Sequence, residues 1–253
     1  MTWQPVDCHA HSTHSDGKLT VAEVVERARE QATRPSVTDH ISHDAPTTVD
    51  SPGAVAQYLD DLDRFDVLRG GEFCWHDTLW YELPPETVRR FTHRVGSLHS
   101  IRLPGDRWFR VFHRDIPEGL TPAMYMEAHV SSLEALAREM PVDVFAHPTL
   151  VSPSLRELDP HDLWSEAHEE RLVNALSAAG IAFEISNRYR PHERIVRRAV
   201  ERGVRISLGS DGHSRAQVAD VAHPLALARS LGVVDTNLYD PTRHGSRTGA
   251  FDE

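Results

Sequence analysis

Residues 6–17 read Val6-Asp7-Cys8-His9-Ala10-His11-Ser12-Thr13-His14-Ser15-Asp16-Gly17, and the rest of the chain follows the same plan. A short apolar run ends in the pattern His-x-His, and an aspartate follows five residues after the second histidine. Because residues two apart in an extended backbone point to the same side, His9 and His11 can face one cation. Imidazole and carboxylate groups are typical ligands of transition metals. The stretch therefore predicts a strand that leads into a metal site.

The arrangement of a short apolar run followed by a helical pattern recurs along the chain. We predict seven strands, at about 6–8, 36–38, 67–70, 95–98, 142–146, 181–185 and 204–208. We predict helices at about 20–31, 52–64, from 84 onward, and at 122–139, 161–179, 193–202 and 218–231. A capping box, Thr20-Val21-Ala22-Glu23, opens the first helix. This alternation favours an α/β protein with a parallel sheet and right-handed crossovers.

The length of 253 residues matches an α/β barrel, although an open doubly wound sheet would give the same alternation. No GxGxxG motif follows the first apolar run, which weakens a dinucleotide-binding alternative. Lys18 is the single lysine, so Schiff-base chemistry is not expected. Residues after about 235 lack periodicity and predict a surface extension that is partly disordered.

Composition restricts the location and the partners of the protein. No apolar run approaches the roughly 18 residues of a membrane span, and the N-terminus lacks a secretory pattern. The two cysteines, Cys8 and Cys74, form no CxxC motif and are predicted to pack in the core. A cytoplasmic location is therefore expected. The net charge of −11 suits cation binding and argues against a stable nucleic-acid partner.

Residues that can bind a metal follow every predicted strand. In chain order they are His9 and His11, Asp39 and His40, Glu72, His99, His147, Glu184 and Asn187, and Asp211 and His213. Strand ends of a parallel barrel converge on one face, so we expect one shared metal site.

Several of the remaining polar residues are expected to have supporting roles or none. Asp39 is expected to orient a histidine rather than to bind metal. Glu184 lies in an apolar run, so it should pair with an arginine or lie at the barrel mouth. Three further histidines on predicted helices, His129, His161 and His168, are expected at the surface.

These motifs resemble those of the PHP family, the polymerase and histidinol phosphatase superfamily of metal-dependent phosphoesterases. The matching elements are His9 and His11 with Ser15-Asp16-Gly17, Thr38-Asp39-His40, Gly70-Gly71-Glu72, Gly96–His99, His147-Pro148 and Gly209–His213. The resemblance implies a single domain over residues 1–253. Its core, at about 6–231, would be a distorted seven-stranded (β/α)7 TIM-like barrel, and residues 235–253 would form a C-terminal extension.

The resemblance also implies a site for two to three divalent ions, of zinc, manganese or iron. One ion would be held by His9, His11, Glu72 and Asp211, a second by Glu72 as a bridge with His99 and His147, and a third by Asp16, His40 and His213. A ligand set this rich in histidine disfavours magnesium and calcium, which prefer oxygen.

The implied activity is hydrolysis of a small phosphomonoester by a metal-activated hydroxide, with histidinol phosphate as the favoured substrate. Glu72, Asp211 and His213 are the expected catalytic residues. The expected substrate-binding residues are Arg188, Arg190, Arg102 and Asn187, with Arg107 and Arg110 as further candidates, because arginine binds phosphate bidentately. The long segment Ile101–Thr121 is expected to cover the site.

Three alternatives remain open at this stage. A nucleotide phosphatase or a short-oligonucleotide 3′–5′ exonuclease would use the same residues. An amidohydrolase-type enzyme also begins with His-x-His, but Lys18 is misplaced for the modified lysine that often bridges its metals. A noncatalytic accessory module would be expected beside polymerase sequence, which this chain lacks.

Overall fold

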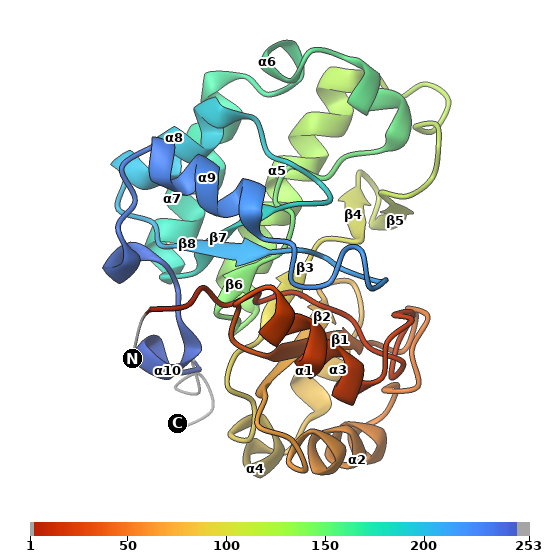
Figure 1. The fold of residues 1–253 in the computed structure, drawn as a ribbon. Coiled ribbons are helices and arrows are strands. Elements are labelled where there is room, and N and C mark those ends of the chain that lie inside the picture. Colours follow the sequence, from red (N-terminus) through yellow and green to blue (C-terminus); the bar gives the residue numbers. More distant parts are fainter. Residues whose placement is uncertain (1–2, 247–253) are drawn as a thin grey trace.

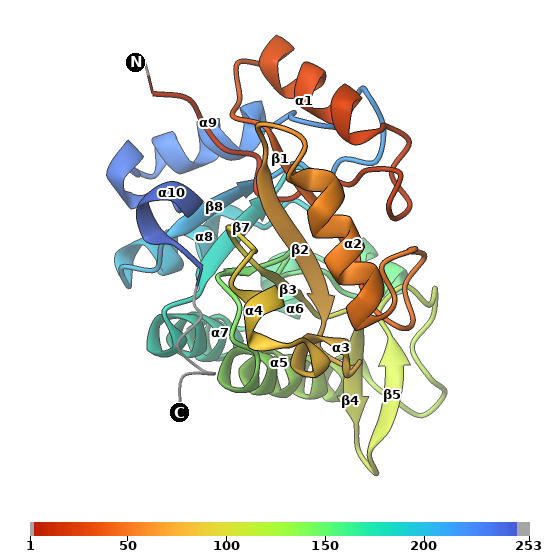
Figure 2. The ribbon, with the colours of Figure 1, turned by 90° about the horizontal axis from the view of Figure 1, so that it is seen from below.

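A computed structural model describes residues 3–246 and is built around one parallel sheet (Figure 1). The strands follow each other in the sheet as they do in the chain: β1 (Ser36–Ile41), β2 (Leu68–Cys74), β3 (Val95–Ser97), β6 (Val144–Phe145), β7 (Ala182–Ser186) and β8 (Ile206–Gly209). The sheet curls like half a barrel, which confirms the expected α/β class (Figure 2). Because all six strands are parallel, their carboxyl ends meet on one face.

The first predicted strand, at residues 6–8, is not formed as a strand. Its segment divides its backbone hydrogen bonds between the two outer strands instead. The Cys8 N–H donates to the Leu208 carbonyl over 2.8 Å, and the Ala10 carbonyl accepts from the Thr38 N–H over 2.7 Å. Only isolated bridges result, because the segment follows neither strand for long enough to build a ladder. The expectation of seven strands is therefore wrong by this one element.

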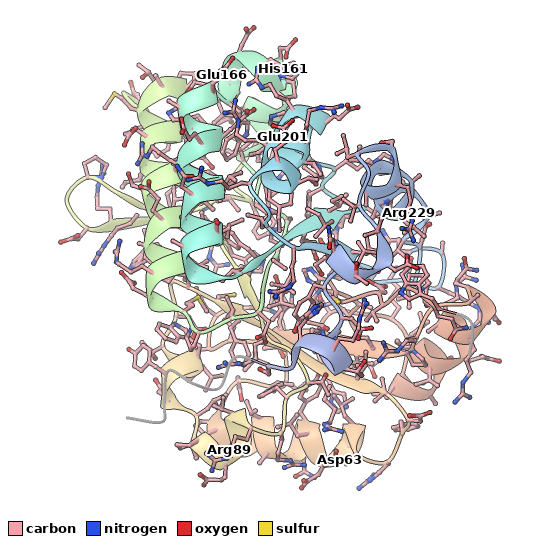
Figure 3. The ribbon with its side chains drawn as sticks, turned by 90° about the vertical axis from the view of Figure 1, so that its left-hand side faces the viewer. Asp63, Arg89, His161, Glu166, Glu201 and Arg229 are labelled. Carbon is pink, nitrogen blue, oxygen red and sulfur yellow. The ribbon has the colours of Figure 1, made fainter. Side chains whose placement is uncertain are left out.

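Long helices cover the outer side of the sheet. They are α1 (Val21–Glu30), α2 (Pro52–Leu62), α5 (Pro122–Glu139), α7 (Glu166–Ala179), α8 (Glu193–Glu201) and α9 (Ala222–Ser230). The predicted capping box is present, since Thr20 and Glu23 satisfy each other's backbone N–H groups. In Figure 3, α5, α7 and α8 lie side by side, with the labelled Glu166 and Glu201 at the surface.

Short elements fill the connections between these helices and strands. They are α3 (Leu79–Glu82), α4 (Pro85–Val88), α6 (Pro160–Leu163), α10 (Pro241–His244) and the 3₁₀ turns η1 (Pro153–Glu157) and η2 (Asp235–Asn237). The predicted helix 161–179 is divided into α6 and α7, because Ser165 caps a new helix by accepting from the His168 N–H. An antiparallel hairpin, β4 (Ser100–Leu103) and β5 (Arg107–Arg110), occupies the segment predicted only as a long connection.

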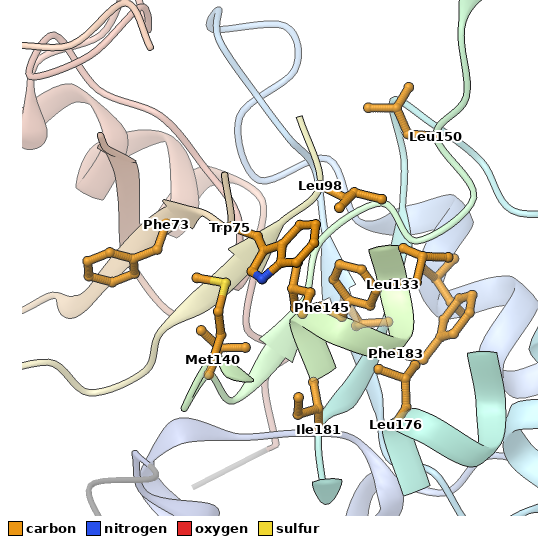
Figure 4. Close-up of a cluster of buried hydrophobic side chains, with 14 of the residues drawn as sticks. Phe73, Trp75, Leu98, Leu133, Met140, Phe145, Leu150, Leu176, Ile181 and Phe183 are labelled. Atoms are coloured by element: carbon orange, nitrogen blue, oxygen red, sulfur yellow. The ribbon is translucent and has the colours of Figure 1, made fainter. Parts of the chain in front are cut away.

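The core lies between the sheet and these helices (Figure 4). Phe145 of β6 and Phe183 of β7 are direct neighbours in the sheet and belong to the same buried cluster as Leu133 of α5. Burying one such aromatic side chain contributes about 1.5–3 kcal/mol. His129, expected at the surface, is buried beside Tyr125 because α5 turns that face toward the core. That expectation was wrong.

The described part of the C-terminal segment packs against the sheet, whereas a partly disordered surface extension was expected. The Tyr239 N–H donates to the Ile206 carbonyl over 2.8 Å, and Asp240 pairs with Arg34 over 2.8 Å. Residues 247–253 lie outside the described residues. Within residues 3–246, no helix has both the length and the apolar character that crossing a bilayer requires.

Candidate metal centre

Glu72 lies at the middle of the site and is fully buried. Its Oε1 is 3.2 Å from Nε2 of His99 and 3.5 Å from Nε2 of His147. Its Oε2 is 2.6 Å from Nδ1 of His40 and 3.5 Å from Nε2 of His9. Four segments of the chain thus direct imidazoles at one carboxylate, because their strand ends converge.

Asp211 and Asp16 extend the cluster on the side of the last strand. Oδ1 of Asp211 lies 3.4 Å from Nε2 of His11 and 3.5 Å from Nδ1 of His213. Oδ1 of Asp16 lies 3.1 Å from Nε2 of His213 and 3.6 Å from Nε2 of His40. All nine predicted metal-binding residues therefore meet in one place.

The cluster contains four groups whose ligand atoms lie within 4.8 Å of one another. The groups are His11, Asp16, His40 and His213; His9, Glu72 and His147; His9, His11 and Asp211; and His40, Glu72 and His99. The groups overlap the three sets implied by the family resemblance without reproducing them. Glu72 is shared in both, but His9, His11 and His40 also belong to two groups each. Residues shared between groups are what a multinuclear centre requires.

Buried polar atoms that form no hydrogen bond show whether the cluster can accommodate a cation. Several buried side-chain atoms of the cluster form no hydrogen bond of acceptable geometry, although some of them lie close together: Nε2 of His9, Nε2 of His11, Nδ1 of His40 and both carboxylate oxygens of Glu72. Leaving such atoms unsatisfied costs about 1–3 kcal/mol each, and more for a charged group. Divalent cations would satisfy these lone pairs together, so the residues fit metal ions.

Electrostatics gives Glu72, His11 and His99 the protonation states that metal binding needs. The pKa values of His9 and His40 are raised, because nearby carboxylates outweigh the effect of burial, so these two rings would release a proton when a cation binds. Burial opposes ionisation of Glu72, but the positive charge of neighbouring histidines, that of His40 above all, outweighs it and holds the pKa of Glu72 well below the usual range. Burial, with the charge of His40, lowers the pKa of His11 to about 4. Burial also lowers the pKa of His99 to about 4. At neutral pH, Glu72 is ionised while His11 and His99 are neutral, as metal ligands must be.

Two carboxylates hold the ligands in position. Glu184 accepts from His9 Nδ1 over 2.8 Å and from the His147 backbone N–H over 2.6 Å, so the expected pairing with an arginine is wrong. Asp39 accepts from the Ser12 N–H over 2.7 Å and from Ser15 Oγ over 2.5 Å. Asp39 forms no direct hydrogen bond with a described histidine ring, but Ser15 Oγ, which it holds, lies 3.3 Å from Nδ1 of His11, so Asp39 can orient this ring through Ser15.

Backbone strain marks the same place. His147 and Asp211 have φ angles of 31° and 50°, in the left-handed region that residues other than glycine rarely adopt. Strain of this kind, of order 1–3 kcal/mol, persists where the surroundings hold a residue for its function.

A cavity of about 300 Å³ opens over the cluster. Besides predicted ligands, it is lined by Arg110 and Phe112 from the hairpin segment and by Arg188 and Tyr189 from the loop after β7. The segment 101–121 therefore reaches the site, as expected. The guanidinium of Arg188 lies 2.8 Å from Nδ1 of His213, so it can contact a molecule bound beside the cluster.

The other three predicted substrate-binding residues do not line this cavity. Arg102 is exposed and pairs with Asp106, because the alternation of β4 turns Ile101 and Leu103 inward instead. Arg190 donates to the Asn187 carbonyl over 3.2 Å. The Asn187 side chain donates to Asp220 over 2.9 Å.

Cys74 lines the cavity, although it was expected only to pack in the core. Its Sγ lies 3.1 Å from Nδ1 of His99. The signal was in the sequence, because Cys74 comes two residues after Glu72 and so shares its side of the strand.

Comparisons with known proteins define the fold. No family model matches the chain, and neither does the sequence of any curated protein. Histidinol phosphate phosphatase of Lactococcus lactis, complexed with zinc, L-histidinol and phosphate, is 17% identical. Its structure matches with a TM-score of 0.72 over 92% of this chain and 95% of that chain. The structure of the putative histidinol phosphatase of Listeria monocytogenes is 15% identical and matches with a TM-score of 0.70, over 86% of this chain and 98% of that chain. The chain therefore has the fold of these phosphatase structures.

Proposed function

We propose that this protein is a metal-dependent phosphoesterase that hydrolyses small phosphomonoesters. The observation that carries the proposal is the convergence of nine ligand-type side chains in one cluster, seven of which line a cavity, with five buried polar atoms of the cluster forming no hydrogen bond. The similarity in fold to a phosphatase complexed with zinc, L-histidinol and phosphate supports the same chemistry.

Two or three zinc, manganese or iron ions would be held by His9, His11, Asp16, His40, Glu72, His99, His147, Asp211 and His213. When bound, they would supply positive charge to the phosphoryl oxygens and lower the pKa of a nearby water. Glu72, Asp211 and His213 would act in catalysis through the ions that they hold. We also propose that the segment around Val6–Ala10 takes the place of a seventh strand and positions His9 and His11.

Arg188 is the proposed phosphate-binding residue. Its guanidinium borders the cavity and lies 3.6 Å from Oδ1 of Asp211. A planar guanidinium can donate two hydrogen bonds to one phosphoryl group and stabilise the charge that develops there during hydrolysis. Tyr189 and Phe112 would exclude water from the other walls of the cavity.

The test measures phosphate release after loading with manganese, zinc or iron. Histidinol phosphate, nucleotides, short oligonucleotides and p-nitrophenyl phosphate form the substrate panel, with an amide substrate for the amidohydrolase alternative. We expect Glu72→Gln and Asp211→Asn to lower kcat by at least about a thousandfold. Glu201→Gln, on the exposed end of α8, is the matched control.

Two results would overturn the proposal. One is a metal-loaded protein that hydrolyses no phosphoester in the panel. The other is a Glu72→Gln variant that keeps full turnover, since the buried carboxylate at the middle of the cluster would then be dispensable.

A further inference from the structure

A second cavity, of about 320 Å³, adjoins the one over the metal cluster. The two cavities share Arg188 and Tyr189. The second cavity lies among the loop after β6, the elements η1 and α6, and the loop after β7. Its remaining lining residues are Thr149, Leu150, Val151, Leu155, Arg156, Leu158, Pro160, Leu163, Trp164, Arg190 and His192. A leaving group attached to a phosphate at Arg188 would have this cavity beside it.

The charged groups of the second cavity all have the same sign. Arg156, Arg188 and Arg190 line it, and none of its described lining residues is a carboxylate. The guanidinium carbons of Arg156 and Arg188 lie 5.2 Å and 5.3 Å from the centre of the Tyr189 ring. Two cations on one aromatic ring repel each other, and burial together with the charge of Arg188 lowers the pKa of Arg156.

Hydrogen bonds to neutral groups hold two of these arginines. Nε of Arg156 donates to the Val151 carbonyl over 2.7 Å, and Arg190 donates to the Asn187 carbonyl and to its side-chain oxygen. Neither Arg156 nor Arg190 forms an ion pair with any described residue. Elsewhere in this acidic chain, arginines meet carboxylates: Arg110, in the first cavity, lies 2.6 Å from Asp44.

We propose that the second cavity binds a second anionic group, a carboxylate or a phosphate, on the leaving group of the substrate. Guanidinium groups bind both anions bidentately, and an anion here would remove the repulsion between Arg156 and Arg188. Leu155, Leu163 and Trp164 would contact the carbon skeleton between the two anions. This inference rests on the proposed function. It favours bis-anionic phosphomonoesters over histidinol phosphate, whose amine would meet three cations.

The test compares substrates that differ in one anion. The pairs are 3-phosphoglycerate with glycerol 3-phosphate for a carboxylate, and glucose 1,6-bisphosphate with glucose 1-phosphate for a second phosphate. We expect kcat/KM to be at least about tenfold higher for the bis-anionic member of one pair. The pair that shows this preference tells whether the second anion is a carboxylate or a phosphate. Arg156→Gln and Arg190→Gln should each remove most of this preference, because they should lower kcat/KM for the bis-anionic member of the pair far more than for its mono-anionic partner.

Arg89→Gln is the matched control, because Arg89 is exposed at the end of α4 (Figure 3) and lines neither cavity. Equal kcat/KM values within both pairs would overturn the inference. So would arginine variants that slow every substrate to the same extent, since that result describes a general disturbance of the fold.

Binding of stable analogues separates this inference from the proposed function. Calorimetry with the metal-loaded protein compares 4-phosphonobutyrate with butylphosphonate, which lacks the second anion. We expect at least about tenfold tighter binding of 4-phosphonobutyrate, lost in Arg156→Gln and kept in Arg89→Gln. Equal affinities would refute binding of a carboxylate in the second cavity. Methylene-linked bisphosphonates would test binding of a second phosphate in the same way. Both measurements can be made even if the protein hydrolyses no phosphoester.

Discussion

Oε1 of Glu184 lies 2.8 Å from Nδ1 of His9, and both side chains are fully buried. Burial opposes a charge on His9, but the charges of Glu184 and Glu72 outweigh it and raise its pKa well above the usual range. A carboxylate can only accept, so Nδ1 carries the proton and donates. The raised pKa means that Nε2, which faces Glu72, also carries a proton, and a bound cation would take the place of that proton. Glu184 thereby prepares His9 to bind a metal.

Replacing Glu184 with glutamine should weaken metal binding. We expect a loss of about 10–100-fold in affinity, because removing the partner of a metal-bound histidine typically has this effect. Metal titration of the chelator-treated protein would measure it, and Glu201→Gln is the control. An unchanged affinity in Glu184→Gln would mean that the ring of His9 is held by other contacts.

Several ligands could be predicted from the sequence because they lie at the ends of separate strands. His40, His99 and His147 needed only the rule that parallel strand ends meet on one face. The pairing of Glu184 with His9 could not be predicted in this way. It depends on two segments 175 residues apart, and on a curl of the sheet that periodicity does not describe.

The wrong predictions have a common physical origin: tertiary contacts override the preference that the local sequence pattern indicates. His129 is buried because α5 is covered on more than one side, with Tyr125 and Trp164 around its imidazole. Residues 6–8 were predicted as a strand, yet the backbone hydrogen bonds of residues 8–10 are divided between β8, through Cys8, and β1, through Ala10. Arg102 was placed near the site by its position in the chain, and only the hairpin register shows it turned outward.

Gly209 should not tolerate even a methyl group. A Cβ at this position would collide with the carboxylate of Glu184, which is itself fixed by His9 and His147. We expect Gly209→Ala to destabilise the fold by about 1–3 kcal/mol and to weaken metal binding. Urea unfolding and metal titration would measure the two effects.

Gly53→Ala is the matched control for this substitution. A Cβ at Gly53 meets nothing within 4 Å, and this glycine lies in the first turn of α2. Alanine there should be neutral or stabilise the protein by up to about 1 kcal/mol. If both variants behaved alike, the contact between Gly209 and Glu184 would have no energetic consequence.

Removing bound metal should lower stability. The buried imidazole and carboxylate atoms of the cluster lose their partners when the ions leave. An ion present at a hundred times its Kd stabilises the folded state by about 2.7 kcal/mol, which corresponds to about 5–11 °C in Tm for a chain of this size. Thermal unfolding with and without a chelator would measure the shift, and manganese or zinc should restore it. A Tm that is insensitive to both would contradict metal binding at this cluster.

His93 should make folding stability depend on pH. It is buried, its Nε2 donates to the Cys8 carbonyl over 3.1 Å, and burial lowers its pKa from 6.5 to about 4. Below pH 6.5 the unfolded chain therefore binds a proton that the folded chain does not, so stability falls as the pH falls toward 4. Between pH 7 and pH 5 the loss should be about 2 kcal/mol. Glutamine keeps a donor for the Cys8 carbonyl but does not titrate.

The measurement is the free energy of unfolding in urea at several pH values, compared between the original chain and His93→Gln. The free energy of unfolding of the original chain minus that of His93→Gln should fall by about 2 kcal/mol from pH 7 to pH 5. Only the original chain loses the contribution of His93. Other titrating groups, including the metal ligands, occur in both proteins and largely cancel in this difference. His161→Gln, at an exposed position, should leave the pH dependence of the original chain unchanged (Figure 3). Parallel curves for the original chain and His93→Gln would show that His93 is protonated as easily in the folded state as in the unfolded state.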